Sequence, residues 1–268
     1  ALGAAEVGQV LDAYRRFFRL PEAAKRSVDM ARTGANRGWG GPKSEQVDPG
    51  ANPDFKEVFD CGRELPQGHP MAARDLPVYA PNLWPEGMPD FRATVERYFE
   101  GAMGVAMEVL RALAAATRGD GAAFDRAFDP PMALLRGNYY PPRPDWAGDK
   151  DFGIAAHSDY GCITLLATDG VPGLEVRMPS GDWQPVRADP GEFIINFGEM
   201  LEFWTAGAAK ATLHRVRGGG EERISVPLFF NPSFDANVAP PGSGEVILAG
   251  EHLDRRFSET YVHLQKKA

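Results

Sequence analysis

Two histidines and one aspartate have the residue types and spacing of a metal site. His157 and Asp159 are two residues apart at the mouth of an expected strand, and His214 lies within another expected strand, 212–216. Alternate residues of a strand point to one face, so His157 and Asp159 are expected to project together. Two imidazoles and one carboxylate suit one face of an octahedral Fe(II), leaving positions open for substrate and dioxygen. A surface histidine beside a solvated aspartate is the simpler alternative for the His-x-Asp pair alone.

Two further strands carry alternating polar residues. Arg223 and Ser225 combine a planar guanidinium fork with a hydroxyl, which together can bind a carboxylate. Arg136, Asn138 and Tyr140 share one face of an earlier expected strand, and polar groups inside a barrel must find partners. This pattern favours a lined pocket over a dry core. The alternatives are an ordinary ion pair for Arg223 and a solvated outer face for the other strand.

The first half of the chain predicts helices. Apolar residues recur at spacings of three and four, and Gly119 suits the C-cap of the longest helix. Residues 33–53 are rich in Gly, Pro, Asn and Ser and predict an extended loop, in which Trp39 could form part of a lid. The expected helices, including one that closes the chain, are 4–20, 90–118, 122–128 and 253–267.

Beyond Pro131 short apolar runs alternate with turn residues, a pattern typical of a jelly-roll sandwich or barrel. Because the helices come first, they are expected to brace the barrel from outside. The predicted fold is therefore mainly β with α, a double-stranded β-helix (jelly roll) in one domain over 1–268. Residues 1–130 form a mainly helical support, 131–250 the jelly-roll core and 251–268 a C-terminal helix. The expected strands are 133–140, 161–167, 174–176, 183–186, 193–197, 212–216, 224–230 and 246–248.

Composition excludes several classes of partner. The formal charge is −8, from 29 basic and 37 acidic residues, which argues against binding to nucleic acid or anionic membranes. The most apolar stretch, 101–116, is interrupted by Glu108 and Arg111, which excludes a membrane span. Cys61 and Cys162 lack zinc-like spacing, and no charged leader with an apolar segment opens the sequence. We therefore expect reduced thiols and a cytoplasmic protein.

Six segments, taken in order, resemble the iron(II)/2-oxoglutarate-dependent dioxygenases of the isopenicillin N synthase-like branch. The resemblance runs from about residue 10 to residue 261, and 54–60 is similar to that family's N-terminal segment. Six motifs in order are far more specific than one His-x-Asp pair. The segments are 135–142, 157–166, 173–176, 190–198, 213–216 and 223–225.

The resemblance implies an oxygenase that depends on Fe(II), 2-oxoglutarate and O2. Such an enzyme oxidises, most often by hydroxylation, a C–H bond of a small organic molecule while 2-oxoglutarate is converted to succinate and CO2. The implied metal ligands are His157, Asp159 and His214. The implied cosubstrate site is formed by Arg223 and Ser225 at the distal carboxylate, with Asn138 and Tyr140 assisting.

Three residues are candidates for the substrate side. Arg136 shares a strand face with the implied cosubstrate residues. Its cation would either attract an acidic or phenolic group or pair with a carboxylate in the wall. Phe229 and Asn231 follow Arg223 on the same strand, and resemblance to the flavonoid-acting members places them at the substrate. The alternative for Phe229 is ordinary core packing.

The sequence departs from the family pattern at several points. Gly137 replaces a bulky apolar residue, which is expected to reshape the pocket floor, and Glu199 stands where Asp is commoner, a minor difference. The family usually begins with a strand before the first helix, whereas this sequence is expected to open inside or just before that helix. The other histidines lack partners at ligand spacing: His69 and His252 are expected in polar loops and His263 on the terminal helix.

Two other functions remain compatible with the residues. One is an iron-dependent oxidase of the same fold that does not use 2-oxoglutarate. The Asn138-Tyr139-Tyr140 sequence argues against the aminocyclopropane-carboxylate oxidase type, whose matching segment resembles Asn-Tyr-Pro. The other is a non-catalytic barrel that binds a small carboxylate. The complete set of His157, Asp159 and His214 argues against it, because such a protein would not need all three metal ligands.

Overall fold

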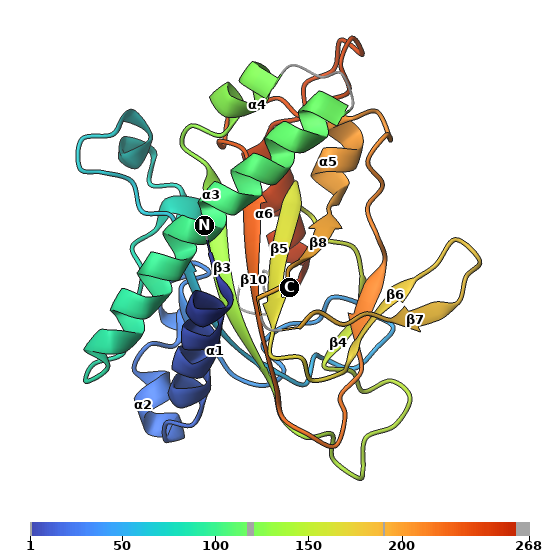
Figure 1. The fold of residues 1–268 in the computed structure, drawn as a ribbon. Helices are drawn as coiled ribbons and strands as arrows, with labels where there is room; N and C mark the ends of the chain where they lie inside the picture. The colour runs from blue at the N-terminus through green and yellow to red at the C-terminus, as the bar shows by residue number, and fades with distance from the viewer. Residues whose placement is uncertain (1, 117–120, 190, 261–268) are drawn as a thin grey trace.

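Two antiparallel sheets form the centre of the protein in the computed structural model, which describes residues 2–116, 121–189 and 191–260 (Figure 1). The larger sheet has the order β1-β2-β3-β10-β5-β8 and the smaller one β4-β9-β6-β7. This sheet-rich arrangement confirms the predicted jelly-roll class. The strands of the larger sheet are β1 (Gly38–Gly40), β2 (Glu57–Gly62), β3 (Met132–Tyr140), β10 (Arg223–Asn231), β5 (Ile163–Thr168) and β8 (Ile194–Phe197). Those of the smaller sheet are β4 (Ile154–His157), β9 (His214–Val216), β6 (Leu174–Arg177) and β7 (Trp183–Pro185).

The helices pack against the larger sheet. The helices α1 and α3 contact β3, β5 and β10 and lie across one face of the sheet, while α6 lies behind it (Figure 1). None of the helices in the described ranges is long and apolar enough to cross a membrane. The α-helices are α1 (Ala4–Phe18), α2 (Glu22–Arg26), α3 (Pro89–Ala116), α4 (Gly121–Ala127), α5 (Glu199–Trp204) and α6 (Ala249–Thr260). Short 3-10 turns are Met30–Arg32, Pro70–Arg74 and Pro77–Tyr79.

The predicted first helix forms because its apolar stripe is buried against the sheet. Val7, Val10, Tyr14 and Phe17 are fully buried, and the helix ends at Phe18, shortly before Pro21. Burial of such side chains is worth about 1.5–3 kcal/mol each, which exceeds the roughly 0.7 kcal/mol that separates ordinary residues in intrinsic helix preference.

Strand alternation divides β3 between two environments. Leu134, Arg136, Asn138 and Tyr140 line a cavity between the sheets, whereas Gly137 faces α1. The expectation that Gly137 reshapes the pocket floor is therefore wrong, because odd and even residues of a strand point to opposite faces.

Two expected loop residues lie instead in regular structure. Trp39 is on β1, only 3% exposed, and its indole Nε1 donates a hydrogen bond to Glu57 Oε2 at 2.7 Å. It is therefore a core residue and no lid. His252 lies on α6 and is buried, so its assignment to a polar loop is also wrong. In both cases glycine or polar neighbours in the sequence concealed a buried position.

The last predicted strand, 246–248, is wrong. Within the described residues this segment makes only an isolated bridge, between Asn237 and Leu248, and Val246 is 72% exposed. A three-residue apolar run cannot distinguish a strand from an extended loop. Strand β2 was not predicted, because buried Asp60 interrupts its apolar pattern. Gly119, His263 and the end of the closing helix lie outside the described residues. Cys61 and Cys162 are free and buried.

Candidate metal and cosubstrate site

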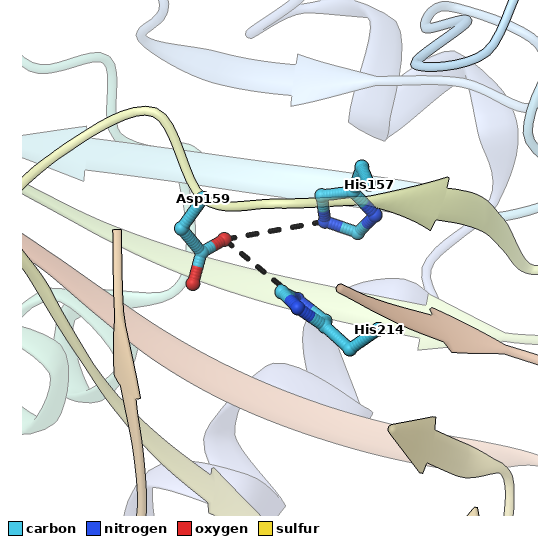
Figure 2. Close-up of side chains that lie close together, drawn as sticks. All are labelled: His157, Asp159 and His214. Carbon is cyan, nitrogen blue, oxygen red and sulfur yellow. Dashed lines mark ion pairs between the residues drawn. The ribbon is translucent and has the colours of Figure 1, made fainter. Parts of the chain in front are cut away.

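The two sheets bring the predicted metal-site residues together. His157 is the last residue of β4 and lies opposite His214, the first residue of β9, while Asp159 follows in the turn after β4. Asp159 Oδ1 lies 4.0 Å from His157 Nε2 and 3.8 Å from His214 Nε2 (Figure 2). One ligand atom from each residue fits within 4.8 Å of the others. The three side chains thus converge on a single point from two adjacent strands and the turn that follows β4.

Backbone carbonyls fix both imidazole rings in the form that binds metal. His157 Nδ1 bonds the Ala155 carbonyl and His214 Nδ1 bonds the Thr212 carbonyl, each at 2.9 Å. A carbonyl only accepts, so each Nδ1 carries the hydrogen and each Nε2 has a free lone pair. Burial, followed by the neighbouring His214, lowers the pKa of His157 to about 4. The His157 imidazole is therefore neutral at pH 7.

Asp159 shows that the donor set fits a cation. The residue is 7% exposed, and its Oδ2 atom has no hydrogen-bond partner in the described part of the chain. A buried carboxylate oxygen without a partner costs free energy, which a bound cation would offset. Two imidazole nitrogens and one carboxylate with open positions are the donor set of non-haem Fe(II) oxygenases. The residues present therefore fit iron.

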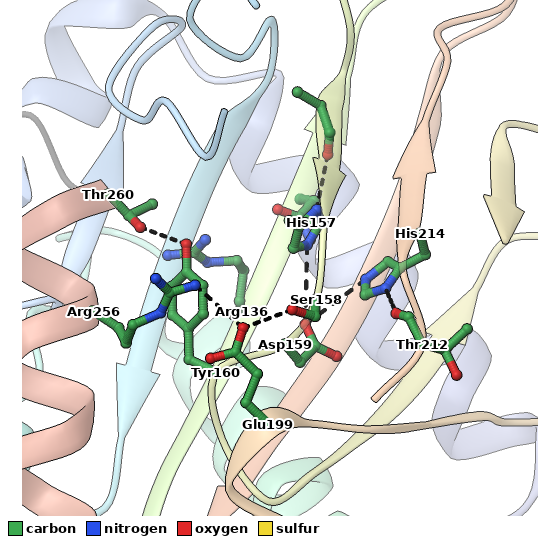
Figure 3. Close-up of polar contacts among 12 residues, drawn as sticks. Arg136, His157, Ser158, Asp159, Tyr160, Glu199, Thr212, His214, Arg256 and Thr260 are labelled. Carbon is green, nitrogen blue, oxygen red and sulfur yellow. Dashed lines mark hydrogen bonds and ion pairs between the residues drawn. The ribbon is translucent and has the colours of Figure 1, made fainter. Parts of the chain in front are cut away.

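A hydrogen-bond network connects the turn that carries Ser158 and Asp159 to α5 and α6 (Figure 3). Ser158 Oγ donates to Glu199 Oε1 at 2.7 Å, and Arg256 Nη2 donates to the same oxygen at 3.2 Å. The Arg256 guanidinium also lies 4.2 Å from the centre of the Tyr160 ring, and the Tyr160 hydroxyl bonds Thr260 Oγ1. The difference at Glu199, expected to be minor, places the acceptor that joins Ser158 to Arg256. Arg256 was missed because no local motif marks it.

The predicted cosubstrate residues face one another across two strands. In the register of β10 against β3, Arg223 lies opposite Tyr140, and Ser225 lies opposite Asn138. Arg223 is 3% exposed and its guanidinium lies 5.1 Å from the centre of the Tyr140 ring. Its Nε donates to the Val171 carbonyl, but Nη1 has no partner among the residues described. A buried cation with an unused donor is suited to an incoming carboxylate.

One cavity of about 120 Å³ joins the metal-site and cosubstrate residues. It lies between the sheets, with His157 and His214 on the smaller one and Arg223 and Ser225 on the larger one. Apolar side chains from both sheets line the same space, among them Leu166, Leu174 and Val216. Walls of this kind exclude water and strengthen the electrostatic interactions inside.

Arg136 lines the cavity but is already paired with carboxylates in its wall. This is the second of the two alternatives expected for it, the first being attraction of an acidic or phenolic group of the substrate. Its Nε and Nη2 donate to Asp60 at 2.8 and 2.6 Å, and Nη1 lies 2.8 Å from Glu45 Oε1. Lys56 also pairs with Glu45. Burial raises the pKa of Glu45, but Arg136 and Lys56 outweigh this and bring it to about 2. Glu45 was not predicted as a partner, because it is distant from Arg136 along the chain.

The other two substrate candidates also line the cavity. Phe229 is only partly buried, and the Arg136 guanidinium lies 5.9 Å from the centre of its ring. Asn231 is buried, and its Oδ1 accepts a hydrogen bond from the Cys162 amide at 2.8 Å. Asn231 therefore supports the fold as well as the cavity wall.

Comparisons with known proteins agree with this site. Residues 131–232 match the model of the 2OG-Fe(II) oxygenase superfamily, and residues 2–87 match that of the non-haem dioxygenase in morphine synthesis N-terminal family. A 2-oxoglutarate-Fe(II) type oxidoreductase of Aspergillus fumigatus is 35% identical over 233 residues, covering 84% of this chain and 69% of that protein. The 2-oxoglutarate-dependent dioxygenase tropC of Talaromyces stipitatus is 35% identical over 265 residues, covering 92% and 78%.

Solved structures give the same result. A full-length Neurospora crassa protein in complex with alpha-KG has a TM-score of 0.83 and 28% identity, covering 96% of this chain and 84% of that one. The same fungal protein with alpha-KG and thymine bound has a TM-score of 0.81, covering 95% and 84%. Fold and donor set together define a non-haem iron oxygenase. The chain belongs to the 2-oxoglutarate- and Fe(II)-dependent oxygenase superfamily, whose reactions use Fe(II), 2-oxoglutarate and O2.

Proposed function

We propose that His157, Asp159 and His214 bind the Fe(II) of this oxygenase and that Arg223 and Ser225 hold the distal carboxylate of 2-oxoglutarate. The observation that carries the proposal is the convergence of three ligand atoms within 4.8 Å of one another, in the cavity that also contains Arg223. The substrate is a small organic molecule, one of whose C–H bonds is oxidised in the rest of that cavity.

Each residue has a definite task in this reaction. The two Nε2 atoms and the Asp159 carboxylate hold the metal, and the carbonyls behind each Nδ1 keep the rings oriented. Arg223 offers Nη1 to the cosubstrate carboxylate, while Asn138 holds the Ser225 hydroxyl at 3.4 Å beside it. When bound, Fe(II) and 2-oxoglutarate supply the oxidation by O2, with release of succinate and CO2.

Two observations support a small-molecule substrate: the volume of the cavity and the ligands bound by a similar protein. The Neurospora crassa protein has been crystallised with thymine and with 5-formyluracil, both small heterocycles. The three substrate candidates contribute different groups to the cavity wall: Arg136 an ion-paired guanidinium, Phe229 an aromatic ring and Asn231 an amide. Because Arg136 is already compensated by Asp60 and Glu45, it adds no excess positive charge to the cavity.

Anaerobic titration with Fe(II) and then 2-oxoglutarate tests the proposal. We expect a visible charge-transfer band from the chelate, and we expect His214→Ala to abolish it. His69→Ala is the matched control, because His69 caps the short helix at Pro70–Arg74 and does not line the cavity. Iron binding without a band on addition of 2-oxoglutarate would support an oxidase that does not use this cosubstrate. Absence of iron binding would support a non-catalytic carboxylate-binding protein.

A further inference from the structure

A second, larger cavity of about 300 Å³ adjoins the site. It lies between α6, the segments 34–37 and 77–78, and the start of β3. Its walls include four residues that also line the inner cavity, namely Leu134, Asn231, Leu253 and Phe257. The two cavities are therefore neighbours that share one set of side chains.

The inner cavity is small for everything it must hold. At about 120 Å³ it is smaller than the roughly 300–1,000 Å³ usual for ligand pockets, and 2-oxoglutarate alone has about ten non-hydrogen atoms. With metal and cosubstrate in place, little room remains there beyond the reacting part of a substrate. The outer cavity, at about 300 Å³, is more than twice as large.

We infer that the two cavities form one substrate site, in which the carbon to be oxidised lies in the inner cavity and the rest of the molecule extends past Leu253 and Phe257 into the outer one. This inference rests on the proposed function, because it takes the inner cavity to hold iron and 2-oxoglutarate. It also makes α6 a determinant of specificity, since Leu253 and Phe257 both belong to that helix.

The outer cavity offers apolar walls and little capacity to bind anions. Pro77, Val78 and Met132 contribute to the walls. Arg37, the one cation among the described residues that line this cavity, is 2% exposed and donates to the carbonyls of Ala80, Asn36 and Val78 at 3.2, 2.8 and 2.7 Å. Each of its three guanidinium nitrogens is therefore engaged by the backbone.

Two acceptor groups complete the outer cavity. Asp254 lies on α6 and is half-buried, and burial, followed by the nearby Glu251, raises the pKa of its carboxyl. Asn36 is 7% exposed, and its Oδ1 has no partner within the ranges that the structure describes. Acceptors that are poorly solvated favour a ligand that donates hydrogen bonds. The substrate class is thus an elongated, mainly apolar molecule with a hydroxyl or N–H group remote from the oxidised carbon.

Two biphenyls test this assignment. Calorimetric titration of 4-phenylphenol, which carries a donor, and of 4-methoxybiphenyl, which lacks one, is carried out anaerobically on enzyme loaded with Fe(II) and 2-oxoglutarate. We expect the phenol to bind about fivefold more tightly, the effect of one net hydrogen bond. It should also perturb the Fe(II)–2-oxoglutarate band, because a molecule confined to the outer cavity would not reach the metal.

Filling the outer cavity should remove this binding. Val78→Trp and Ser258→Trp place an indole at two walls of the cavity, and each should weaken 4-phenylphenol about tenfold or more without changing the band of the unliganded chelate. Val246→Trp, at a 72% exposed position shortly before α6 that lines neither cavity, is the control and should leave binding intact.

Three results would overturn the inference while the band remains normal: no binding of either biphenyl, equal binding of both, or unchanged affinity in both tryptophan variants. Absence of the band in the wild-type protein is a different outcome. It rejects the proposed function itself, and the inference with it.

Discussion

Gly137 of β3 lies directly against the ring of Tyr14 on α1: a β-carbon at Gly137 would be 2.1 Å from Tyr14 Cδ1. Tyr14 is fully buried and stacks edge-on against Phe91 of α3, so its ring cannot move aside without disturbing the helix layer. The aromatic side chain thus occupies the space that the bulky strand residue of the family would fill. Packing between α1 and the sheet explains the departure at Gly137.

Gly137→Ala should therefore destabilise the protein by about 1–3 kcal/mol, the usual cost of overpacking a core. The control is Gly104→Ala on α3, where a β-carbon would meet nothing within 4 Å and where alanine is favoured in a helix. Urea denaturation measures both. In a double-mutant cycle with Tyr14→Ala, the cost of Gly137→Ala should shrink, and a fully additive cycle would contradict the explanation.

Glu199 is expected to position the metal ligands through Ser158. Replacement by leucine removes the acceptor for Ser158 and Arg256, and we expect Fe(II) affinity to fall about 10–100-fold. Glu199→Gln keeps an oxygen for Ser158 and should restore most of that affinity. Anaerobic titration of Fe(II) in the presence of 2-oxoglutarate is the measurement, and thermal denaturation shows whether the variants are folded. Equal losses in the two variants would mean that the Fe(II) affinity depends on the negative charge of Glu199 and not on its hydrogen bond to Ser158.

Arg223→Leu should raise the 2-oxoglutarate dissociation constant by about 10–150-fold, the value of one charge-assisted hydrogen bond. Fe(II) binding measured without 2-oxoglutarate should change little, because Arg223 contacts none of the proposed ligands. Arg217→Leu, at an exposed arginine that directly follows β9, is the control. Equal loss of iron and 2-oxoglutarate in Arg223→Leu would show that the guanidinium supports the fold.

Asp54 should make stability depend on pH. Burial raises the pKa of this 1% exposed carboxyl to about 6, even though Lys56 Nζ lies 3.4 Å away. The unfolded value is about 3.9, so the folded state favours the protonated acid. That stabilisation is complete below about pH 4 and is lost as the pH rises through about 6.

Asp54→Asn does not titrate, so the free energy of unfolding of the wild type relative to this variant should fall between about pH 4 and 6 and then level off above about 7. Urea denaturation across this range measures the difference. Asp182→Asn, in the exposed turn between β6 and β7, controls for the loss of one aspartate. A difference that is flat or rises with pH would show that Lys56 stabilises ionised Asp54.

The local pattern of residues was enough to predict much of this protein. Apolar spacing predicted α1 and the body of α3, and alternation placed Asn138, Ser225 and Arg223 on the cavity faces of their strands. The reason is that helix and strand periodicity are properties of consecutive residues. Ordered motifs then identified the family, and with it the chemistry.

Only the tertiary structure decided what lies across from what. The pairing of Arg136 with Asp60 and Glu45, the bonds from Arg256 to Glu199, and the outer cavity beside α6 all join segments far apart in the chain. At contacts between distant segments, close packing limits the size of the side chains, and burial requires that charged groups be paired. Neither constraint can be deduced from residues that are neighbours in the sequence. For the same reason, the sequence could predict the oxygenase chemistry, whereas the two cavities beside α6 depend on how that helix packs against the sheets.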